Sequence, residues 1–430
     1  MDKMYDKIKQ ALVRWYILKK ECHVHRQVTC QPESEGTNRS EKTLVIIPCD
    51  PDGVIGSRGD EAMIVASIQH FQKNNGEESS IYVVCSNEFH NPGWPTIETR
   101  YNVKLLRIWH GPFPNGVVAR EIEKLHPSHI NILGADCMDG YYSPNISFEL
   151  LSLYVIFQKR GYKTSLLGFS YNNHPHPLSN RLFKKIGKEV VFNLRDSQSL
   201  RNFSHFTSIP QIRLVADSAF MLMPNKESEA RKRYEGVITA LRNQGISTVL
   251  AFNFHPMLSK NQTDEELSIY THKLAEHLNR LLRRNPKLAI VLLPHDDRAR
   301  ISDNFVLQEI YNYLSQENGE RVVYDSRVYR SEDIKGFVDL FDGVISSRMH
   351  LAIAAMGMEV PVMTVEYQGK FRGLFKHFKY PERFLLTPEE FTSNIFEQST
   401  EDFIEQLPDL KKCLQQALPE VMKLSSLNFQ

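Results

Sequence analysis

Short apolar runs alternate with amphipathic segments along most of the chain, and this alternation constrains the fold more than any other feature. Runs such as "TLVIIP" from Thr43, "LAIVLLP" from Leu288 and "PVMTV" from Pro361 are apolar on both faces. Strands of a parallel sheet have this character because helices cover both faces of the sheet. Stretches between the runs, such as "DEELSIYTHKLAEHLNRLLRRN", have helical spacing. The sequence therefore predicts an α/β fold with doubly wound parallel sheets.

The length of the chain predicts more than one domain. It has 430 residues, whereas single domains typically have about 50–250. A polar stretch, "MPNKESEARKRYEG", separates two series of strands and helices. Ligands of such sheets bind at the carboxyl ends of the strands, so two facing domains would enclose a cleft there. We predict an N-terminal helix and linker, two Rossmann-like domains and a C-terminal helical segment that packs back across the domains and is helical apart from its prolines, at residues 1–42, 43–226, 227–395 and 396–430.

Composition and motifs exclude several classes of function. The net charge of +1 gives no overall field that would attract nucleic acid. No apolar run reaches the roughly 18 residues of a membrane span. The six cysteines form no Cys-x-x-Cys pair, and no His spacing typical of a metal site occurs. Neither the dinucleotide nor the P-loop fingerprint is present. We expect a reduced, cytoplasmic protein that needs no metal and does not bind nucleic acid.

A Gly-rich loop follows the first strand, in "LVIIPCDPDGVIGSRGDEAMIVASIQHF" from Leu44. Gly53, Gly56 and Gly59 permit close approach of the backbone to another group. Asp60 is expected at the N-cap of the following helix, with Glu61 in its first turn. Such a loop either holds a ligand or is only a tight turn between a strand and a helix.

A second loop, in "FDGVISSRMHLAIAAMGMEVPVMTV", joins a buried strand to a helix. Ser346 and Ser347 are expected at the N-cap, and Arg348 and His350 in the first turn. Helix N–H groups, a guanidinium and an imidazole would then converge on one place, which suits a phosphate or carboxylate. The alternatives are a surface salt bridge for Arg348 and a structural role for His350.

Four other strand ends carry polar side chains. In "FNLRDSQSLRNF", Asp196 is expected to cap a helix and Arg195 to point into the cleft. His295 in "IVLLPHDDRARISDN" could serve as an acid or base, or be a loop histidine with solvated neighbours. Asp136 in "ILGADCMDGYY" and Asp217 in "LVADSAFML" end two more strands.

Five of these blocks together resemble the polysaccharide pyruvyl transferase family. They are "GSRGDE", "LRDSQS", "VADSAF", "PHDD" and "SSRMHLAIAAMGMEVPV", and the resemblance covers residues 43–380. The Ser-Arg-x-His block followed by Gly-x-x-Val-Pro-Val is the most specific part. The first loop departs from the family's usual Gly-Asn-x-Gly-Asp because Ser57 replaces the Asn, and "GADCMDG" stands where a Gly-rich strand end is common.

The resemblance implies a GT-B-like pair of domains and a specific reaction. The enolpyruvyl group of phosphoenolpyruvate is transferred to two hydroxyls of one sugar, which forms a pyruvate ketal in cell-surface polysaccharide biosynthesis. Phosphoenolpyruvate is then a co-substrate, and no cofactor is required. With the loops described above, it suggests Arg195, Arg348, Met349 and His350 as donor-binding residues, His350 or His295 as the acid, and Gly56, Ser57, Gly59, Asp60 and Asp136 as acceptor-side or loop residues.

Two other functions remain compatible with the sequence. A GT-B glycosyltransferase would use the same cleft for a nucleotide sugar, because diphosphates also bind at helix N-termini. A non-catalytic member of a polysaccharide assembly complex would bind a ligand without releasing phosphate. The choice of donor distinguishes the first alternative from pyruvyl transfer, since function follows from the site and not from the fold.

Residues 3–20 have the pattern of an amphipathic helix, with Tyr5, Trp15 and Tyr16 among lysines. Such a helix packs on the body of the protein, lies on a membrane surface or docks a partner. The resemblance implies an acceptor that is a sugar or a lipid-linked oligosaccharide. A lipid-linked acceptor favours weak, salt-sensitive contact with the inner face of the cell membrane.

Overall fold

The computed structural model of the chain describes residue 19 and residues 40–111, 114–188, 190–256, 263–296, 298, 302–366 and 369–430. The amphipathic helix predicted for residues 3–20 lies outside these ranges except for Lys19, so its membrane contact stays a prediction. Among the described helices, none combines the length and the apolar character required to cross a bilayer.

The first sheet contains five parallel strands in the order β3-β2-β1-β4-β5. Its central strand β1 pairs with β2 on one side and with β4 on the other, and Val45 lies opposite both Tyr82 and Ile130. A short parallel pair, β6 and β7, adjoins β5 through a bridge between Phe169 and Leu194. These strands are β1 (Ser40–Ile47), β2 (Ser80–Ser86), β3 (Val103–Trp109), β4 (Pro127–Leu133), β5 (Lys163–Leu167), β6 (Phe192–Leu194) and β7 (Ile212–Leu214).

The second sheet contains six parallel strands in the order β10-β9-β8-β11-β12-β13. In each sheet the first strand of the series lies at the centre and the fourth pairs with it on the side away from the second, which is the Rossmann arrangement. The fold class predicted from the sequence is confirmed, and the dipeptide strand β13 is an addition. The strands are β8 (Thr248–Asn253), β9 (Leu288–Leu292), β10 (Val322–Tyr324), β11 (Gly343–Ser346), β12 (Val362–Val365) and β13 (Leu385–Leu386).

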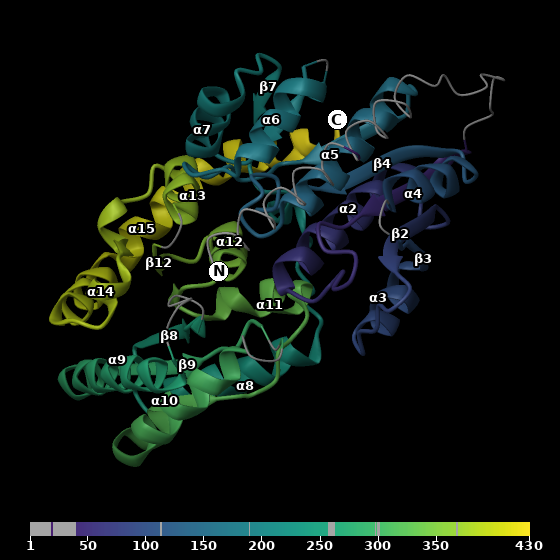
Figure 1. Cartoon of the computed structure of the whole chain (residues 1–430). Coiled ribbons are helices and arrows are strands. Elements are labelled where there is room, and N and C mark those ends of the chain that lie inside the picture. The colour runs from purple at the N-terminus through teal and green to yellow at the C-terminus, as the bar shows by residue number, and fades with distance from the viewer. Residues whose placement is uncertain are drawn as a thin grey trace.

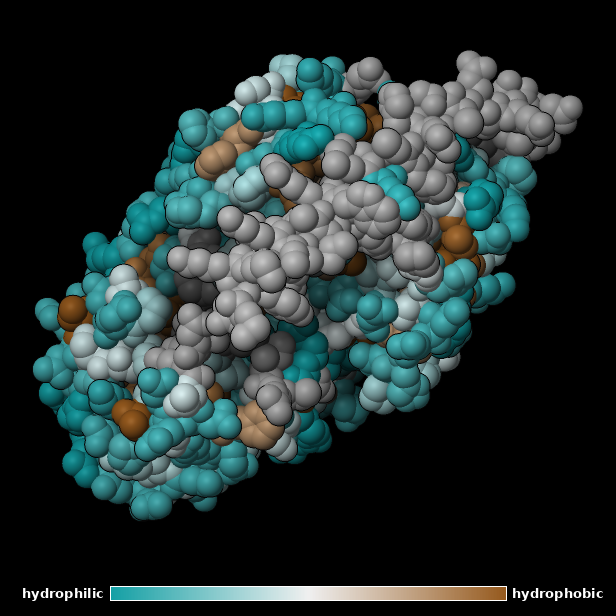
Figure 2. Space-filling model, viewed as in Figure 1, coloured by the Kyte–Doolittle hydropathy of each residue, from teal (hydrophilic) through white to brown (hydrophobic). Residues whose placement is uncertain are grey.

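Helices cover the sheets (Figure 1) and enclose a core of apolar strand residues. Leu44, Val45, Ile46 and Ile47 of β1 are fully buried, which explains why this strand is apolar on both faces. The side of the molecule in Figure 2 is largely hydrophilic outside the grey atoms, with scattered hydrophobic side chains. The longer helices are α2 (Arg58–Asn75), α3 (Trp94–Tyr101), α4 (Pro114–Glu123), α5 (Pro144–Lys159), α6 (Pro177–Ile186), α7 (Ser197–Thr207), α8 (Glu229–Asn243), α9 (Asp264–Arg284), α10 (Asp303–Asn318), α11 (Ser331–Phe337), α12 (Met349–Gly357) and α13 (Lys370–Phe378).

A long C-terminal helix returns from the second domain to the first, as expected from the sequence. After α14 (Pro388–Phe391), helix α15 (Asn394–Ser426) contacts α9 and α13 and then the short helix η1 (Ser218–Met221). Asn428 accepts a hydrogen bond from the Gly168 N–H at 2.6 Å and donates one to the Ala216 carbonyl at 2.8 Å. The predicted breaks at the prolines are wrong, because α15 continues through Pro408 and Pro419. Each proline lacks the backbone N–H that would bond within the helix. The apolar face of α15 is nevertheless buried, including Leu414 and Val421.

A buried carboxylate joins the two domains behind the cleft. Glu61 of α2 is 1% exposed and accepts hydrogen bonds from Arg58 in its own helix and from Arg330 and Ser331 in the second domain. The Ser331 N–H lies 2.8 Å from Glu61 Oε1, so this first-domain side chain supplies an acceptor to the first turn of α11. The boundary predicted at residues 226 and 227 falls between η1 and α8 and stays a prediction.

Candidate active site

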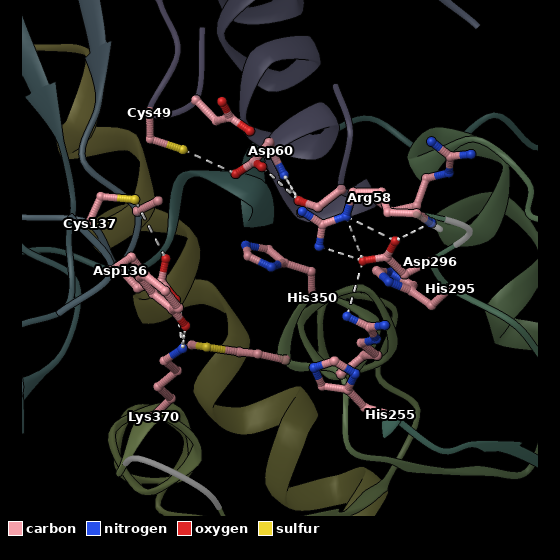
Figure 3. A pocket seen from close by; sticks show the side chains of 18 of the residues that line it. Cys49, Arg58, Asp60, Asp136, Cys137, His255, His295, Asp296, His350 and Lys370 are labelled. Atoms are coloured by element: carbon pink, nitrogen blue, oxygen red, sulfur yellow. Dashed lines mark hydrogen bonds and ion pairs between the residues drawn. The ribbon is translucent and has the colours of Figure 1, made fainter. Parts of the chain in front are cut away.

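A cavity of about 410 Å³ lies between the two domains, at the carboxyl ends of their strands (Figure 3). The first domain lines it with the loops that follow β1, β4 and β6, and the second domain with those that follow β8, β9 and β11. The strand order reverses between β1 and β4 in the first sheet and between β8 and β11 in the second, so the helices that follow the two strands of each pair leave in opposite directions. Open α/β sheets bind their ligands at such a switch point. The cavity thus combines the switch points of two Rossmann-like sheets.

Ser57, and not Asp60, caps the first helix of the site. The Ser57 hydroxyl accepts a hydrogen bond from the Asp60 N–H at 3.0 Å, and α2 begins at Arg58. The predicted N-cap was therefore three residues too late, because the Ser three positions earlier reaches the same amide. Gly59 and Asp60 lie in the first turn of α2 and line the cavity together with Ser57.

Asp60 has an environment that makes its ionised form less favourable than it is in water. Burial raises the pKa of its carboxyl group to about 6, against the opposing effects of the Ser57 hydroxyl and the Arg298 guanidinium. The Ser57 hydroxyl and the Cys49 thiol donate to its two oxygens at 2.8 and 3.3 Å. A pKa of about 6 is within the range that suits a carboxyl group to serve as an acid or a base.

Arg348 is the N-cap residue of α12, and the cap predicted at Ser346 and Ser347 is wrong. The Ser346 hydroxyl accepts from the Arg348 N–H at 2.9 Å, but Ser346 still belongs to β11, and the Ser347 hydroxyl accepts from the His255 N–H at 2.6 Å. The structure assigns no capping side chain to α12. Within the described part of the chain, its N-terminus, with the positive end of the helix dipole, therefore stands at the cavity without a side-chain cap.

The Arg348 guanidinium is held between two buried carboxylates. It donates to Asp303 at 2.6 and 3.0 Å and to Asp296 at 3.1 Å, and both acids are almost fully buried. Asp296 also forms an ion pair with Arg298, whose Nη2 lies 2.6 Å from Asp296 Oδ2. This arrangement excludes the surface salt bridge that was the alternative for Arg348. The guanidinium is fixed in the cavity wall before any ligand arrives.

His350 lies near the middle of the site, against the start of α2 (Figure 3). A Cβ atom at Gly59 would overlap with the imidazole, so this glycine is required for the close approach of the two helix N-termini. Asp217 Oδ2 lies 3.7 Å from Nε2, and Nε2 has no hydrogen-bond partner within the described part of the chain. Burial lowers the pKa of His350, while the Asp217 charge opposes this shift.

Substitution of Gly59 tests this contact. Gly59→Ala is expected to displace the His350 ring and to reduce any activity of this site by about 100-fold, because displacement of a group by about 1 Å can have this effect in an active site. Gly236→Ala in α8 is the control, since a Cβ there meets nothing within 4 Å. We expect it to leave activity unchanged and to stabilise the protein by about 0.5–1 kcal/mol. Equal activity of the two variants would contradict the placement of His350.

Two further histidines line the cavity and are neutral. Burial lowers the pKa of His255 to about 2, with a further contribution from Arg348. Burial also lowers the pKa of His295 well below its usual value, and the surrounding charges of Arg348, Arg58 and Arg298 act in the same direction. His295 follows β9 as predicted, and its N–H donates to Asp303 at 2.9 Å. Its burial excludes the alternative of a loop histidine among solvated neighbours.

Arg195 lines the cavity from the first domain, in the predicted position after β6. Its Nε donates to the Ser170 hydroxyl at 2.6 Å and its Nη1 to Asp217 at 3.0 Å. Asp196 caps α7 as predicted, since its side chain accepts from the Ser199 N–H at 2.7 Å. Asp217 thus contacts both Arg195 and His350, and it links the cationic walls of the two domains.

Asp136 forms an ion pair across the cleft that the sequence did not reveal. Lys370, at the start of α13, donates to Asp136 at 2.6 Å. Burial would raise the pKa of Asp136, but the charges of Lys370 and Arg195 outweigh it, and the net pKa is low. Lys370 follows a strand in the same manner as the residues that were predicted, but no neighbouring motif distinguished it from other surface lysines.

Most of the residues singled out from the sequence meet in this cavity. Among the residues suggested for the donor, the acid and the acceptor side, Gly56 is the exception; it lies beside the site, where a Cβ would be 3.3 Å from Arg298 Cδ. Sequence reasoning did not identify Arg58, His255 or Arg298, although each follows a predicted strand or loop that was recognised. The predicted residues that line the cavity are Ser57, Gly59, Asp60, Asp136, Arg195, His295, Arg348, Met349 and His350.

Solved structures with a similar fold bind or convert sugar nucleotides. A putative UDP-N-acetylglucosamine 2-epimerase from Listeria monocytogenes is 12% identical, with a TM-score of 0.56 over 87% of this chain and 91% of that one. The UDP-GlcNAc 2-epimerase from Neisseria meningitidis, bound to UDP-GlcNAc, is 13% identical, with a TM-score of 0.56 over 90% and 97%. A UDP-forming α,α-trehalose-phosphate synthase from Burkholderia vietnamiensis is 12% identical, with a TM-score of 0.52 over 92% and 96%. These similarities show a GT-B type fold.

The sequence itself identifies the family. No curated protein matches the chain significantly. The family model for polysaccharide pyruvyl transferase matches residues 58–369, which include both halves of the cavity, from Arg58 at the start of α2 to the loop before α13. The match covers most of the chain, and the protein therefore belongs to the polysaccharide pyruvyl transferase family.

Proposed function

We propose that the protein transfers the enolpyruvyl group of phosphoenolpyruvate to two hydroxyls of a sugar, as part of cell-surface polysaccharide biosynthesis. The observation that carries this proposal is the interdomain cavity, where five cationic side chains and the uncapped N-terminus of α12 surround one space. Phosphoenolpyruvate has a phosphate and a carboxylate, and both suit such a site. The five cations are Arg58, Arg195, Arg298, Arg348 and Lys370.

The donor is proposed to lie at the N-terminus of α12, against Arg348, Met349 and His350, with Arg195 opposite. Buried carboxylates hold both arginines in place, so their charges need no reorganisation when the donor binds. Fixed charges of this kind stabilise charge that develops on a leaving group. Their role in the reaction is to bind the phosphate oxygens as the bond to C2 breaks.

The reaction needs proton transfer but no net acid or base. The methylene carbon of the donor gains one proton, and the first sugar hydroxyl adds to C2. The C2–O bond to phosphate then breaks, and the second hydroxyl closes the ketal at the same carbon. Two protons leave the hydroxyls; one replaces the proton given to the methylene group, and the other leaves with phosphate. One group must therefore act as an acid and another as a base.

His350 is proposed as the acid and Asp60 as the base. Burial lowers the pKa of His350 in the free protein, but the charge of Asp217 opposes this shift, and the negative charges of the bound donor would act in the same direction as Asp217. His295 is surrounded by arginines and stays neutral, so it suits a hydrogen-bonding role with the donor. Asp60 lies on the first-domain wall, where the acceptor is proposed to bind, and receives the hydroxyl proton.

The central experiment supplies phosphoenolpyruvate and a panel of free and lipid-linked oligosaccharides to the full-length protein. We expect release of inorganic phosphate and a pyruvate ketal adduct on the saccharide, detected by mass spectrometry. Release of a nucleoside diphosphate from UDP-GlcNAc would instead support a glycosyltransferase, the alternative that the GT-B fold leaves open. Donor binding without phosphate release from any acceptor would support a non-catalytic role.

The two histidines are separated by isotope incorporation. In deuterated water the ketal methyl group gains one deuterium from the acid. We expect His350→Gln to reduce the rate of this step by about 10²–10⁴-fold, which is the usual contribution of a general acid. His295→Gln is expected to keep the step and to weaken donor binding. Full activity of His350→Gln would show that another group supplies the proton.

The pH dependence tests Asp60. As a base it must be ionised, so kcat/KM for the donor is expected to rise as the pH increases through about 6, and Asp60→Asn should lose this limb. Stability gives an independent readout. The pKa of Asp60 in the folded protein exceeds the ordinary value of 3.8, so the folded state binds more protons than the unfolded state between these two values. The stability of the wild type relative to Asp60→Asn should therefore fall as the pH rises from about 4 to about 6. A pH profile shared by both proteins would exclude Asp60 as the base.

A further inference from the structure

A second cavity of about 460 Å³ adjoins the first on the side of the first domain. Asp136, Tyr142 and Lys370 line both cavities. Lys370 bonds to the Asp136 carboxylate at 2.6 Å and to the Tyr142 hydroxyl at 3.2 Å, so these three side chains form the partition between the two spaces. The volume of the second cavity lies within the range of about 300–1,000 Å³ that is typical of ligand pockets.

The walls of the second cavity differ in chemistry from those of the first. The amides of Asn172, Asn202 and Gln198 and the hydroxyl of Ser199 line it, and each already donates one hydrogen bond within the protein. An amide nitrogen carries a second N–H, and amide and hydroxyl oxygens have two lone pairs, so both donors and acceptors remain for a ligand. Charged groups balance, because Asp136 and Asp139 are matched by Lys370 and Arg372. The first cavity instead has five cations and four aspartates, one of which has a raised pKa.

Two aromatic rings stand at this cavity. Tyr141 and Tyr142 are each 48% exposed, and their rings meet edge to face with centroids 5.2 Å apart. The Asp139 carboxylate accepts from the Tyr141 N–H at 2.9 Å and from the Asn172 side chain at 2.7 Å, which fixes the loop that carries both tyrosines. Large aromatic rings held open to solvent cover apolar surface of a ligand at little cost in conformational entropy.

The geometry points to a binding site for a neutral sugar residue next to the one that receives the pyruvyl group. Sugar rings present hydroxyls to amide and hydroxyl groups, and C–H faces to aromatic rings. The inference rests on the proposed function, and it makes the acceptor a glycan of at least two sugars whose chain crosses the partition at Asp136 and Lys370. A phosphate or diphosphate fits less well, because the two cations there are matched by two carboxylates.

The test uses an array of defined mono- to pentasaccharides, with phosphoenolpyruvate present, and four proteins. These are the wild type, Tyr141→Ala, Tyr141→Phe and Phe305→Ala. Phe305 is 65% exposed in α10 and outside both cavities, so its variant controls for loss of an exposed ring. We expect the wild type to retain saccharides of two or more sugars. Tyr141→Ala should lose about tenfold in affinity for them, whereas Tyr141→Phe and Phe305→Ala should not.

Kinetics provide the second measurement. Two acceptors are compared: the best-bound saccharide, and a methyl glycoside of the one sugar unit in it that receives the pyruvyl group. We expect kcat/KM to be about tenfold higher for the saccharide in the wild type and about equal for both acceptors in Tyr141→Ala. Tyr141→Ala should leave the value for the monosaccharide unchanged. Equal use of both acceptors by the wild type, or an equal loss on both in Tyr141→Ala, would overturn the inference.

The two proposals fail in different ways. If no acceptor releases phosphate but the array still shows binding that depends on Tyr141, the glycan site stands and pyruvyl transfer fails. If phosphate is released only with monosaccharides and no saccharide of two or more sugars binds on the array, pyruvyl transfer stands and the glycan site is refuted. If longer glycans bind equally to the wild type and Tyr141→Ala, the second cavity is not their site.

Discussion

Arg348→Ala is expected to abolish donor binding and to lower the free energy of unfolding by about 3–5 kcal/mol, the usual effect of removing one partner of a buried ion pair. Asp303, which is fully buried, would lose its only bonded cation among the described residues. Asp296 would keep Arg298, so the loss concentrates on one carboxylate. Chemical denaturation measures the first effect, and calorimetric titration with phosphoenolpyruvate the second.

A double variant separates the two effects. Asp303 Oδ2 accepts from Asn253 at 2.8 Å and from the backbone N–H groups of His295 and Asp296 at 2.9 and 3.1 Å. An amide oxygen at this position has two lone pairs and can keep the two shorter bonds. Asp303→Asn combined with Arg348→Ala therefore removes the unpaired charge and should recover most of the stability. Donor binding should stay lost, because the guanidinium is still absent. Normal affinity for phosphoenolpyruvate in the double variant would refute the role of Arg348 in binding.

Glu61→Ala is expected to destabilise the protein by a similar amount, about 3–5 kcal/mol, through a different site. The change would leave Arg58 and Arg330 without this buried carboxylate, and the Ser331 N–H without its acceptor. Because these groups belong to both domains, we also expect the wild type to unfold in one transition and Glu61→Ala in two, as the domains uncouple. Denaturation followed by circular dichroism and by fluorescence would show the split as transitions that no longer coincide.

Two controls accompany this prediction. Glu61→Gln keeps an oxygen for the Ser331 N–H and loses only the charge, so its effect should be smaller than that of Glu61→Ala. Glu265→Ala removes an exposed glutamate from the first turn of α9 and should change stability by no more than about 0.5 kcal/mol. A small effect of Glu61→Ala would mean that the two domains do not depend on this carboxylate.

The strands of both sheets were predictable from the sequence, because parallel strands buried on both faces are short apolar runs that stand out from amphipathic helices. Arg195, His295 and His350 could be placed at strand ends for the same reason, and the carboxyl edge of the sheets brings them together. The helix caps were less predictable. Ser57 and Asp60 are both good caps, and only the backbone geometry decides which side chain reaches an open N–H group.

Interactions between distant segments could not be predicted. Lys370 and Asp136 are 234 positions apart in the chain, and their ion pair depends on how the two domains face one another. The same holds for Gly59, where the reason for a glycine is the His350 ring from the other domain. A single sequence shows which residues follow strands, but it does not show which of them will be neighbours across a domain interface.

The return of α15 to the first domain has a mechanical consequence. The chain passes between the domains twice, once through residues 222–228 and once through α15, and the two crossings lie together because Ser425 donates a hydrogen bond to the Asp217 carbonyl at 2.7 Å. Two adjacent connections form a hinge: they allow the domains to rotate about one axis, and they restrict translation and twisting of one domain relative to the other. Asp217 lies at this hinge and also contacts His350 and Arg195, so a rotation of the domains would change the geometry of the candidate active site directly.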